Sequence, residues 1–345
     1  MPTRARVFAL TASVVVLLPL AASAQTADVA AATSTPPSPP RAAQSGEASG
    51  TRIVSDPLYL PLKGQVFGVT AYSFARPTGQ NFKDGSETSS FTSDDNAFAQ
   101  TLAYGLSNRL TARVAFGYGV NERDSTAAAT GDVTVGNARG FNDPTFSVTW
   151  RVIDEPASPL VLDVTGGYSP NLLTAIASGG VGEGSIARGG QNADIAFAVG
   201  HVARAFTLAG TVTTTYVGDQ TTEQLSNGTS TSAAAHWSYA AGVATQTRFT
   251  SRTSLDAGVS VGSAAGYTVV NLANGNSHTY APPVTRSVNL ALNYHFRPNQ
   301  FVGALTYAYD NNTDATNTFT KAASDTAVKD RSGQTVGFRL LYAFQ

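Results

Sequence analysis

The sequence predicts an all-β fold, a transmembrane antiparallel up-and-down β-barrel of twelve strands. Charged residues make up only 13% of the 345 residues, whereas hydrophobic residues make up 42%. That charged share is about half of what soluble domains usually carry. Segments in which apolar and polar residues alternate recur along the chain, with the two-residue period of a strand. The connections between these segments are alternately short and long, which is typical of outer-membrane barrels.

Residues 1–24 have the features of a secretory signal peptide. Arg4 and Arg6 supply a basic start, residues 7–21 form a short apolar run, and Ala22-Ser23-Ala24 is a small-residue cleavage site. A buried N-terminal helix is the alternative, but it would leave both the basic start and the small-residue end unexplained. We therefore expect export through a cleaved signal peptide and a location in a bacterial outer membrane.

Residues 25–52 form a tract rich in Ala, Ser, Thr and Pro that includes TPPSPP. Such a composition cannot bury a core, so we expect a disordered periplasmic arm here. The barrel is then predicted over residues 53–345. The chain contains no cysteine, so its stability does not depend on disulfides.

Twelve alternating segments follow, and each has the length and the apolar row of a strand that faces lipid on one side. The apolar row of the last segment contains Phe338 and Phe344, separated by small or polar residues. The predicted strands lie near residues 62–75, 95–107, 109–121, 141–153, 159–170, 190–203, 205–218, 235–249, 252–264, 284–297, 299–310 and 333–344.

Loop length sorts the connections into two groups. The sequences SNR, DEPAS, TSR and RPN, and a turn near Arg204, make five short connections. The other six are long and polar, as in residues 75–95 and 121–139. Short periplasmic turns and long extracellular loops produce this alternation and place both termini in the periplasm. A water-soluble β-sandwich, which is the alternative fold, has no reason to sort its loops by length.

Aromatic residues test the same topology because they favour the two membrane interfaces. Outward-pointing aromatics fall at the two ends of the strands, with mostly Val, Leu, Ala and Gly between them. One predicted belt contains Trp150, Phe206, Phe249, Phe296, Phe301, Tyr342 and Phe344. The other contains Tyr72, Phe74, Tyr118, Phe141, Tyr168, Tyr216, Trp237, Tyr239, Tyr307 and Tyr309.

The inward rows follow from the same alternation. An Arg or Lys that faced lipid at mid-depth would cost about 2–4 kcal/mol, so ionised side chains are expected inside. They either orient solutes in a pore or brace the wall through salt bridges and hydrogen bonds. Most other inward positions are small, which leaves a narrow channel unless a loop or the N-terminal arm fills it. The predicted lumen-lining residues are Arg113, Arg151, Asp163, Asp256, Asn293, His295 and Arg339.

Several function classes lack support. The net charge of −1 and the pI of 6.4 give no basic surplus for nucleic acid. The four His residues are not spaced for a metal site, and none lies in a segment typical of a lipid hydrolase. We therefore expect no catalytic residue, no metal and no cofactor.

Two stretches carry a family resemblance. The barrel entry DPLYLPLKGQ and the segment GFNDPTFSVTWRV, with Gly140 and Asp143 in a G-x-x-D pattern, resemble outer-membrane barrels grouped with the meta-pathway of phenol degradation. Trp150 stands where that family usually has another aromatic. The resemblance implies a transporter-like barrel for aromatic or other hydrophobic compounds.

The ending LLYAFQ is similar to the signal recognised by the barrel-assembly machinery, except that Gln345 follows the aromatic residue.

The expected function is passive diffusion of small solutes through an outer-membrane channel or transporter, and not enzymatic. The alternatives are a non-conducting structural or receptor barrel and an outer-membrane lipid hydrolase. Expected partners are outer-membrane lipid and lipopolysaccharide, the barrel-assembly machinery during biogenesis and a small-molecule solute.

Overall fold

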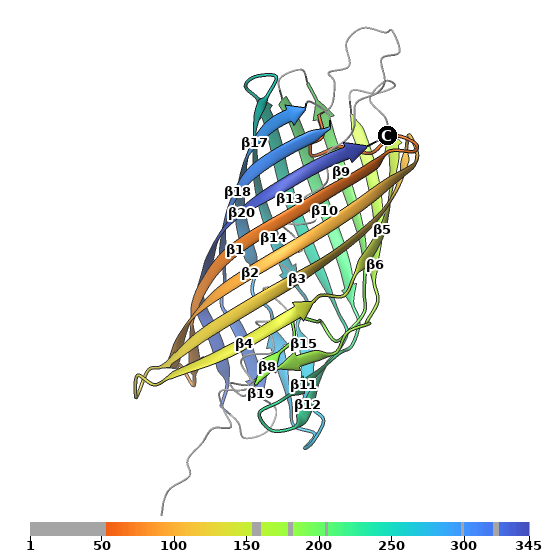
Figure 1. Cartoon of the computed structure of the whole chain (residues 1–345). Helices are drawn as coiled ribbons and strands as arrows, with labels where there is room; N and C mark the ends of the chain where they lie inside the picture. The colour runs from red at the N-terminus through yellow and green to blue at the C-terminus, as the bar shows by residue number, and fades with distance from the viewer. Residues whose placement is uncertain are drawn as a thin grey trace, which may run out of the picture.

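The computed structural model describes residues 53–153, 160–178, 182–203, 206–297, 300–319 and 324–344. They form a closed barrel of twelve antiparallel strands, as the sequence predicts (Figure 1). Pairing of the first strand with the last closes the wall, with Val66 opposite Phe344. The wall strands are β1 (Val66–Lys83), β2 (Ser86–Ser107), β3 (Leu110–Ala127), β5 (Thr145–Ile153), β6 (Val161–Ser169), β9 (Asn192–Val202), β10 (Phe206–Val217), β13 (His236–Arg248), β14 (Thr253–Ala264), β17 (Thr285–Arg297), β18 (Phe301–Asn312) and β20 (Thr326–Phe344).

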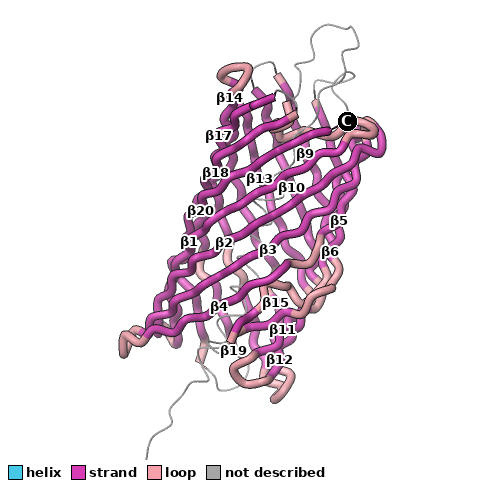
Figure 2. Tube along the Cα trace, in the orientation of Figure 1, coloured by secondary structure: helices cyan, strands magenta, loops and turns pink. Residues whose placement is uncertain are grey.

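The two ends of the barrel differ. The end that holds the C-terminus, here named the short-turn end, carries tight turns such as that between Ser107 and Leu110. The opposite end, here named the long-loop end, carries further strands (Figure 2). These are β4 (Val133–Phe141), β7 (Ala175–Ala177), β8 (Glu183–Gly184), β11 (Gln220–Gln224), β12 (Thr229–Ala233), β15 (Tyr267–Asn271), β16 (Ser277–Ala281) and β19 (Ala315–Phe319).

Several connections expected to be long polar loops are instead hairpins. Residues 75–95 continue β1 and β2 beyond the predicted strand ends to a two-residue turn at Asp84-Gly85. Both turn residues have positive φ, 50° and 78°, as a type I′ turn requires. Residues 121–139 likewise extend β3 and form most of β4. The wall therefore extends well past the predicted strands at the long-loop end.

Side chains alternate between the outer face and the interior along each wall strand. In β20, Phe338 and Phe344 are 41% and 60% exposed on the outer face, while Leu341 and Ala343 are buried. Aromatics at both predicted belts are likewise exposed, including Trp150, Phe206, Phe249 and Phe296 near the short-turn end. Those towards the long-loop end include Tyr72, Phe141, Tyr168, Trp237 and Tyr239. An outer surface with apolar residues and aromatic rows at two levels is what a lipid-facing barrel presents.

The predicted signal peptide and periplasmic arm, residues 1–52, lie outside the described residues, as do the connections at 154–159, 204–205 and 298–299. Within the described ranges, the chain has no helix long and apolar enough to cross a membrane.

Candidate functional site

A segment of the chain lies inside the barrel at the short-turn end. Residues 53–65, here named the inner segment, precede β1 and do not join the wall as a strand. The first strand was predicted from residue 62 and begins at Val66. Pro57 and Pro61 cannot donate to a strand ladder, so they favour an irregular path. Two turns shape that path: the Asp56 amide donates to the Ile53 carbonyl, and the Tyr59 amide donates to Asp56.

Apolar side chains seat the inner segment against strands on opposite sides of the barrel. Val54 and Tyr59 pack with Phe67 of β1, with Val302 of β18 and with Leu341 of β20. Leu58 packs across the lumen against a second group, which consists of Val161, Ala198, Val202 and Ala209. Val54, Leu58 and Tyr59 are at most 1% exposed. The inner segment therefore crosses the lumen from one side of the wall to the other at this end.

One glycine of the wall leaves room for the inner segment. A Cβ atom added at Gly105 of β2 would lie 1.9 Å from the Leu62 carbonyl oxygen, closer than any real contact. The backbone of the inner segment also bonds to β2 here, because the Gly64 amide donates to the Gly105 carbonyl at 2.8 Å. The absence of a side chain at Gly105 is thus a condition for this packing.

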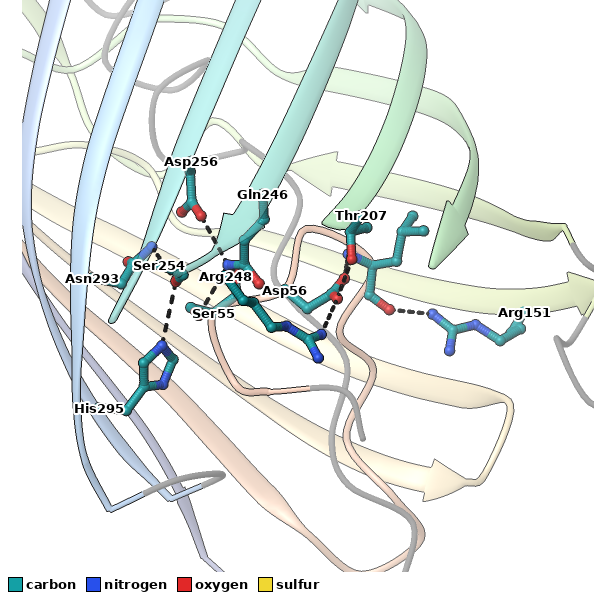
Figure 3. A network of polar contacts seen from close by, with 11 residues as sticks. Ser55, Asp56, Arg151, Thr207, Gln246, Arg248, Ser254, Asp256, Asn293 and His295 are labelled. Atoms are coloured by element: carbon teal, nitrogen blue, oxygen red, sulfur yellow. Dashed lines mark hydrogen bonds and ion pairs between the residues drawn. The ribbon is translucent and has the colours of Figure 1, made fainter. Parts of the chain in front are cut away.

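Asp56 is the polar anchor of the inner segment (Figure 3). It is fully buried, and its Oδ1 accepts a hydrogen bond from the Leu58 amide at 2.9 Å. Its Oδ2 accepts from Thr207 Oγ1 of β10 at 2.6 Å and pairs with Arg248 Nη2 of β13 at 3.3 Å. Hydrogen bonds to an ionised group contribute about 1.5–3 kcal/mol each. This carboxylate therefore links the inner segment to two neighbouring wall strands.

Two more wall residues hold the inner segment through its backbone. Gln246 Nε2 of β13 donates to the Ser55 carbonyl at 2.8 Å and also contacts Ser55 Oγ at 3.0 Å. Arg151 Nη2 of β5 donates to the Leu58 carbonyl at 2.6 Å. Arg151 also forms a bidentate pair with Asp163 of β6 at 2.8 and 2.9 Å, and both side chains are about 5% exposed or less. A buried pair held in this way orients the guanidinium towards the Leu58 carbonyl.

The structure brings the seven predicted lumen-lining residues to the short-turn third of their strands, around the inner segment or close to it. Arg339 Nη2 lies 3.8 Å from Asp256 Oδ2, and Asp256 Oδ1 accepts a hydrogen bond from Gln246 Nε2 at 2.8 Å. Arg113 lies on β3, and Asp163 and Asp194 are its acidic electrostatic neighbours. A role for any of the seven in solute passage stays a prediction. Strand alternation predicted the inward side of the wall, but it could not predict that Asp56 and Ser55 would bind there.

Asn293 and His295 form a cluster with Ser254 that resembles a hydrolase triad only in composition. Ser254 Oγ lies 3.3 Å from His295 Nε2, and Asn293 Nδ2 donates to that same Oγ at 3.2 Å. In a triad the third residue orients the His, whereas here Asn293 contacts the Ser. His295 Nδ1 has no hydrogen-bond partner among the described residues, and all three side chains are at most 1% exposed. This geometry supports a structural contact.

The G-x-x-D segment lies where strand β3 changes its pairing partner. Strand β3 pairs with β4 towards the long-loop end and with β5 towards the short-turn end, and residues 142–144 join those two strands. Gly140 has a φ of +138°, and Asp143 is 2% exposed. Asp143 Oδ1 accepts from the Leu172 and Leu173 amides at 2.8 and 2.9 Å. The Asp143 carboxylate therefore holds the connection after β6 against the point where β5 replaces β4 as the partner of β3.

That connection also enters the barrel. A Cβ atom at the inward-facing Gly119 would lie 3.0 Å from Ile186 Cδ1, and Ile186 and Ala187 are each only 9% exposed. This part of the connection therefore packs on the inner wall and narrows the lumen from the long-loop side. Within the described ranges, no three His, Asp or Glu side chains gather as a metal site.

Comparison with known proteins supports the fold. No family model matches the sequence, and no curated protein matches it. Among solved structures, the chain is similar to an outer-membrane channel from Pseudomonas putida F1, with 16% identity, a TM-score of 0.53, and coverage of 83% of this chain and 97% of that one. It is also similar to the transport unit of the autotransporter AIDA-I from Escherichia coli, with 13% identity, a TM-score of 0.49, and coverage of 81% and 90%. A third similar structure is the toluene transporter TodX of P. putida, at 9% identity, a TM-score of 0.44, and coverage of 82% and 90%. At 16% identity, the likeness to the first of these structures concerns the fold alone.

Proposed function

We propose that this chain is a channel for small solutes in a bacterial outer membrane and that the inner segment closes it at the periplasmic mouth. The signal peptide predicted over residues 1–24 accounts for export, and the short-turn end is the periplasmic side. Aromatic and hydrophobic compounds remain the solutes that the family resemblance suggests. Passage is passive and follows the concentration gradient.

The seating of the inner segment is the observation that carries this proposal. It is a single pass of chain, held on the wall by a few polar side chains, by apolar packing and by backbone bonds to Gly105, and the barrel ladder closes without it because β1 pairs with β20. Removing it breaks no wall hydrogen bond between strands. A barrel built only as an anchor or receptor needs no segment seated in its lumen.

Single-channel conductance of the refolded protein in a planar bilayer tests the proposal. The intact chain is expected to open rarely, and a variant that lacks residues 53–62 is expected to conduct in large, long-lived steps. Folding of both proteins is checked by circular dichroism. If the deletion variant folds and stays silent, the channel function is wrong, and the structural or receptor barrel becomes the better interpretation.

A further inference from the structure

The connection that enters the barrel from the long-loop end carries an arginine. Residues 182–190, here named the inward turn, contain Ile186 and Ala187, which are each 9% exposed. Ile186 packs against the inner wall at Gly119, and Arg188 follows two residues later. The inward turn therefore brings a cation to the inside of the barrel from a connection that lies between two wall strands.

The backbone of the inward turn is fixed against β11. The Thr221 amide donates to the Gly189 carbonyl at 2.9 Å. Gly189 has a φ of +71°, and a Cβ atom added there would overlap the Thr221 carbonyl oxygen. Any other residue would strain the backbone and also meet that oxygen. Close backbone packing thus sets the position of the neighbouring Arg188.

Arg188 is directed at polar groups of the neighbouring wall. Its Nη1 donates to the side-chain oxygen of Asn192 at 2.6 Å. Its acidic electrostatic neighbours are Asp143 and Asp194. Asp194 lies on the inner face of β9, and a Cβ atom at Gly167 of β6 would overlap its Oδ1, so this carboxylate lies flat against the wall. Arg188 and Asp194 are therefore neighbours inside the barrel.

A second arginine faces the same carboxylate. One row across neighbouring strands contains Arg113 of β3, Ser147 of β5, Gly167 of β6 and Asp194 of β9. The two residues in the middle of the row are small, and the two at its ends are electrostatic neighbours. Arg113 Nε is buried and has no hydrogen-bond partner among the described residues. Asp194 is therefore shared by Arg113 and Arg188.

The charges in this part of the lumen balance only when Arg188 is counted. Arg113 and Arg188 supply two positive charges, and Asp143 and Asp194 supply two negative charges. Asp163, the other acidic neighbour of Arg113, is already neutralised by its bidentate pair with the β5 arginine. Without Arg188, two carboxylates would face one guanidinium, and this part of the lumen would attract cations.

We propose that Arg188 is a specificity-determining residue of the channel, because it cancels the acidic charge that Asp143 and Asp194 would otherwise present to a passing solute. The proposal rests on the proposed function and deepens it by naming the class of solute. A lumen whose charges balance has no net field that favours ions of one sign, so it suits neutral and dipolar molecules. The alternative role for Arg188 is to brace the inward turn, which would not change the sign of the ions that pass.

The reversal potential of the variant that lacks residues 53–62, recorded in a planar bilayer under a salt gradient, tests the proposal. In this open variant Arg188→Gln should raise the cation-to-anion permeability ratio by about twofold or more, because one lumen cation is lost. Arg188→Lys should leave the ratio unchanged. Arg188→Gln together with Asp194→Asn should restore it, because one charge of each sign is then absent. The matched control is Arg76→Gln, which breaks the exposed pair of Arg76 with Asp94 and should not change the ratio.

A thiol probe tests the same charge without conduction, because the chain has no cysteine of its own. Ser147→Cys places a thiol in the row between Arg113 and Asp194. The folded protein in detergent micelles is labelled with a negatively charged and with a positively charged methanethiosulfonate reagent. Adding Arg188→Gln should lower the ratio of the anionic to the cationic labelling rate by about twofold or more.

Unchanged permeability and labelling ratios in folded Arg188→Gln would overturn the proposal, as would a double variant that behaves like the single one. A thiol at position 147 that reacts with neither reagent would also overturn it, because the row would then not face an accessible lumen. The two proposals fail separately. If the deletion variant folds and stays silent, the channel function is wrong, and the labelling ratio still decides whether Arg188 sets the charge of the lumen. If it conducts and both ratios are unchanged, only the role of Arg188 is wrong.

Discussion

Asp56 of the inner segment and Arg248 of β13 form an ion pair, with Oδ2 and Nη2 3.3 Å apart, although 192 positions separate them in the sequence. The same carboxylate oxygen accepts a hydrogen bond from Thr207. These contacts therefore connect the inner segment, which is not part of the wall, to the wall strands β10 and β13. On the proposed function, the frequency of channel opening depends on how firmly these contacts hold.

Gly105 tests whether the inner segment can be displaced without harm to the barrel. Gly105→Ala places a Cβ where the Leu62 carbonyl now lies, 1.9 Å away, so the inner segment has to move. We expect more frequent channel openings from Gly105→Ala in planar bilayers. The matched control is Gly166→Ala on β6, where a Cβ would have no atom within 4 Å. Equal opening frequencies for the two variants would contradict the seating described here.

The pH dependence of opening is expected to come in part from Tyr59. Burial raises the pKa of this phenol above its usual value near 10. Its contribution to the seated state is therefore fully present below about pH 10 and is lost as the pH rises towards the raised pKa. We expect channel openings to become more frequent above about pH 10 and Tyr59→Phe to reduce this rise.

The same substitution has an effect at neutral pH. The Tyr59 hydroxyl has no hydrogen-bond partner among the described residues, and a buried unpaired hydroxyl costs about 1–3 kcal/mol. Tyr59→Phe should therefore make openings rarer than in the unchanged protein at pH 7. More frequent openings at pH 7 would show that the hydroxyl helps to hold the inner segment.

Arg151 and Asp163 are expected to stabilise the barrel as a pair. Arg151→Ala leaves a buried carboxylate unpaired, so it should lower the free energy of unfolding by about 3–5 kcal/mol. The double substitution Arg151→Met with Asp163→Leu removes both charges and should cost less than the single change. Urea unfolding in detergent micelles measures both. A double variant that is less stable than Arg151→Ala would contradict this assignment.

Arg113 and Arg339 distinguish solute selection from bracing of the wall. We expect the replacement of both by Ser to shift the ion selectivity of the open deletion variant towards cations, because two lumen cations are lost. The reversal potential in a salt gradient measures that shift. Unchanged selectivity together with a lower unfolding midpoint would assign these two residues to bracing, alongside Asp256, which lies 3.8 Å from Arg339.

Much of the wall could be predicted from the sequence because strand alternation is a local signal. The predicted strand at residues 284–297, for example, differs from β17 (Thr285–Arg297) by a single residue at its start. The hairpin at Asp84-Gly85 was missed, although Asp-Gly between strands is a known turn signal, because its polar flanks suggested a loop. Long strands outside a bilayer need no apolar row on their outer face, so that cue is absent there.

The seating of the inner segment could not be predicted in the same way. Thr207 and Arg248 lie on strands with a clear two-residue period, but their partner Asp56 lies in a segment without one. Pro57 and Pro61 were a usable signal that this stretch does not continue a ladder. Which wall residues it would contact depends on the closed barrel, since β5, β10 and β13 come together only in three dimensions.

A reversible crosslink measures the central claim most directly, because the chain has no native cysteine. Asp56→Cys with Thr207→Cys replaces side chains whose oxygens lie 2.6 Å apart, so a disulfide would fix the inner segment to β10. Single-channel conductance is recorded before and after reduction. The account predicts a closed barrel when oxidised and frequent openings once the bond is reduced and the Asp56 contacts are gone. The same conductance in both states would contradict it.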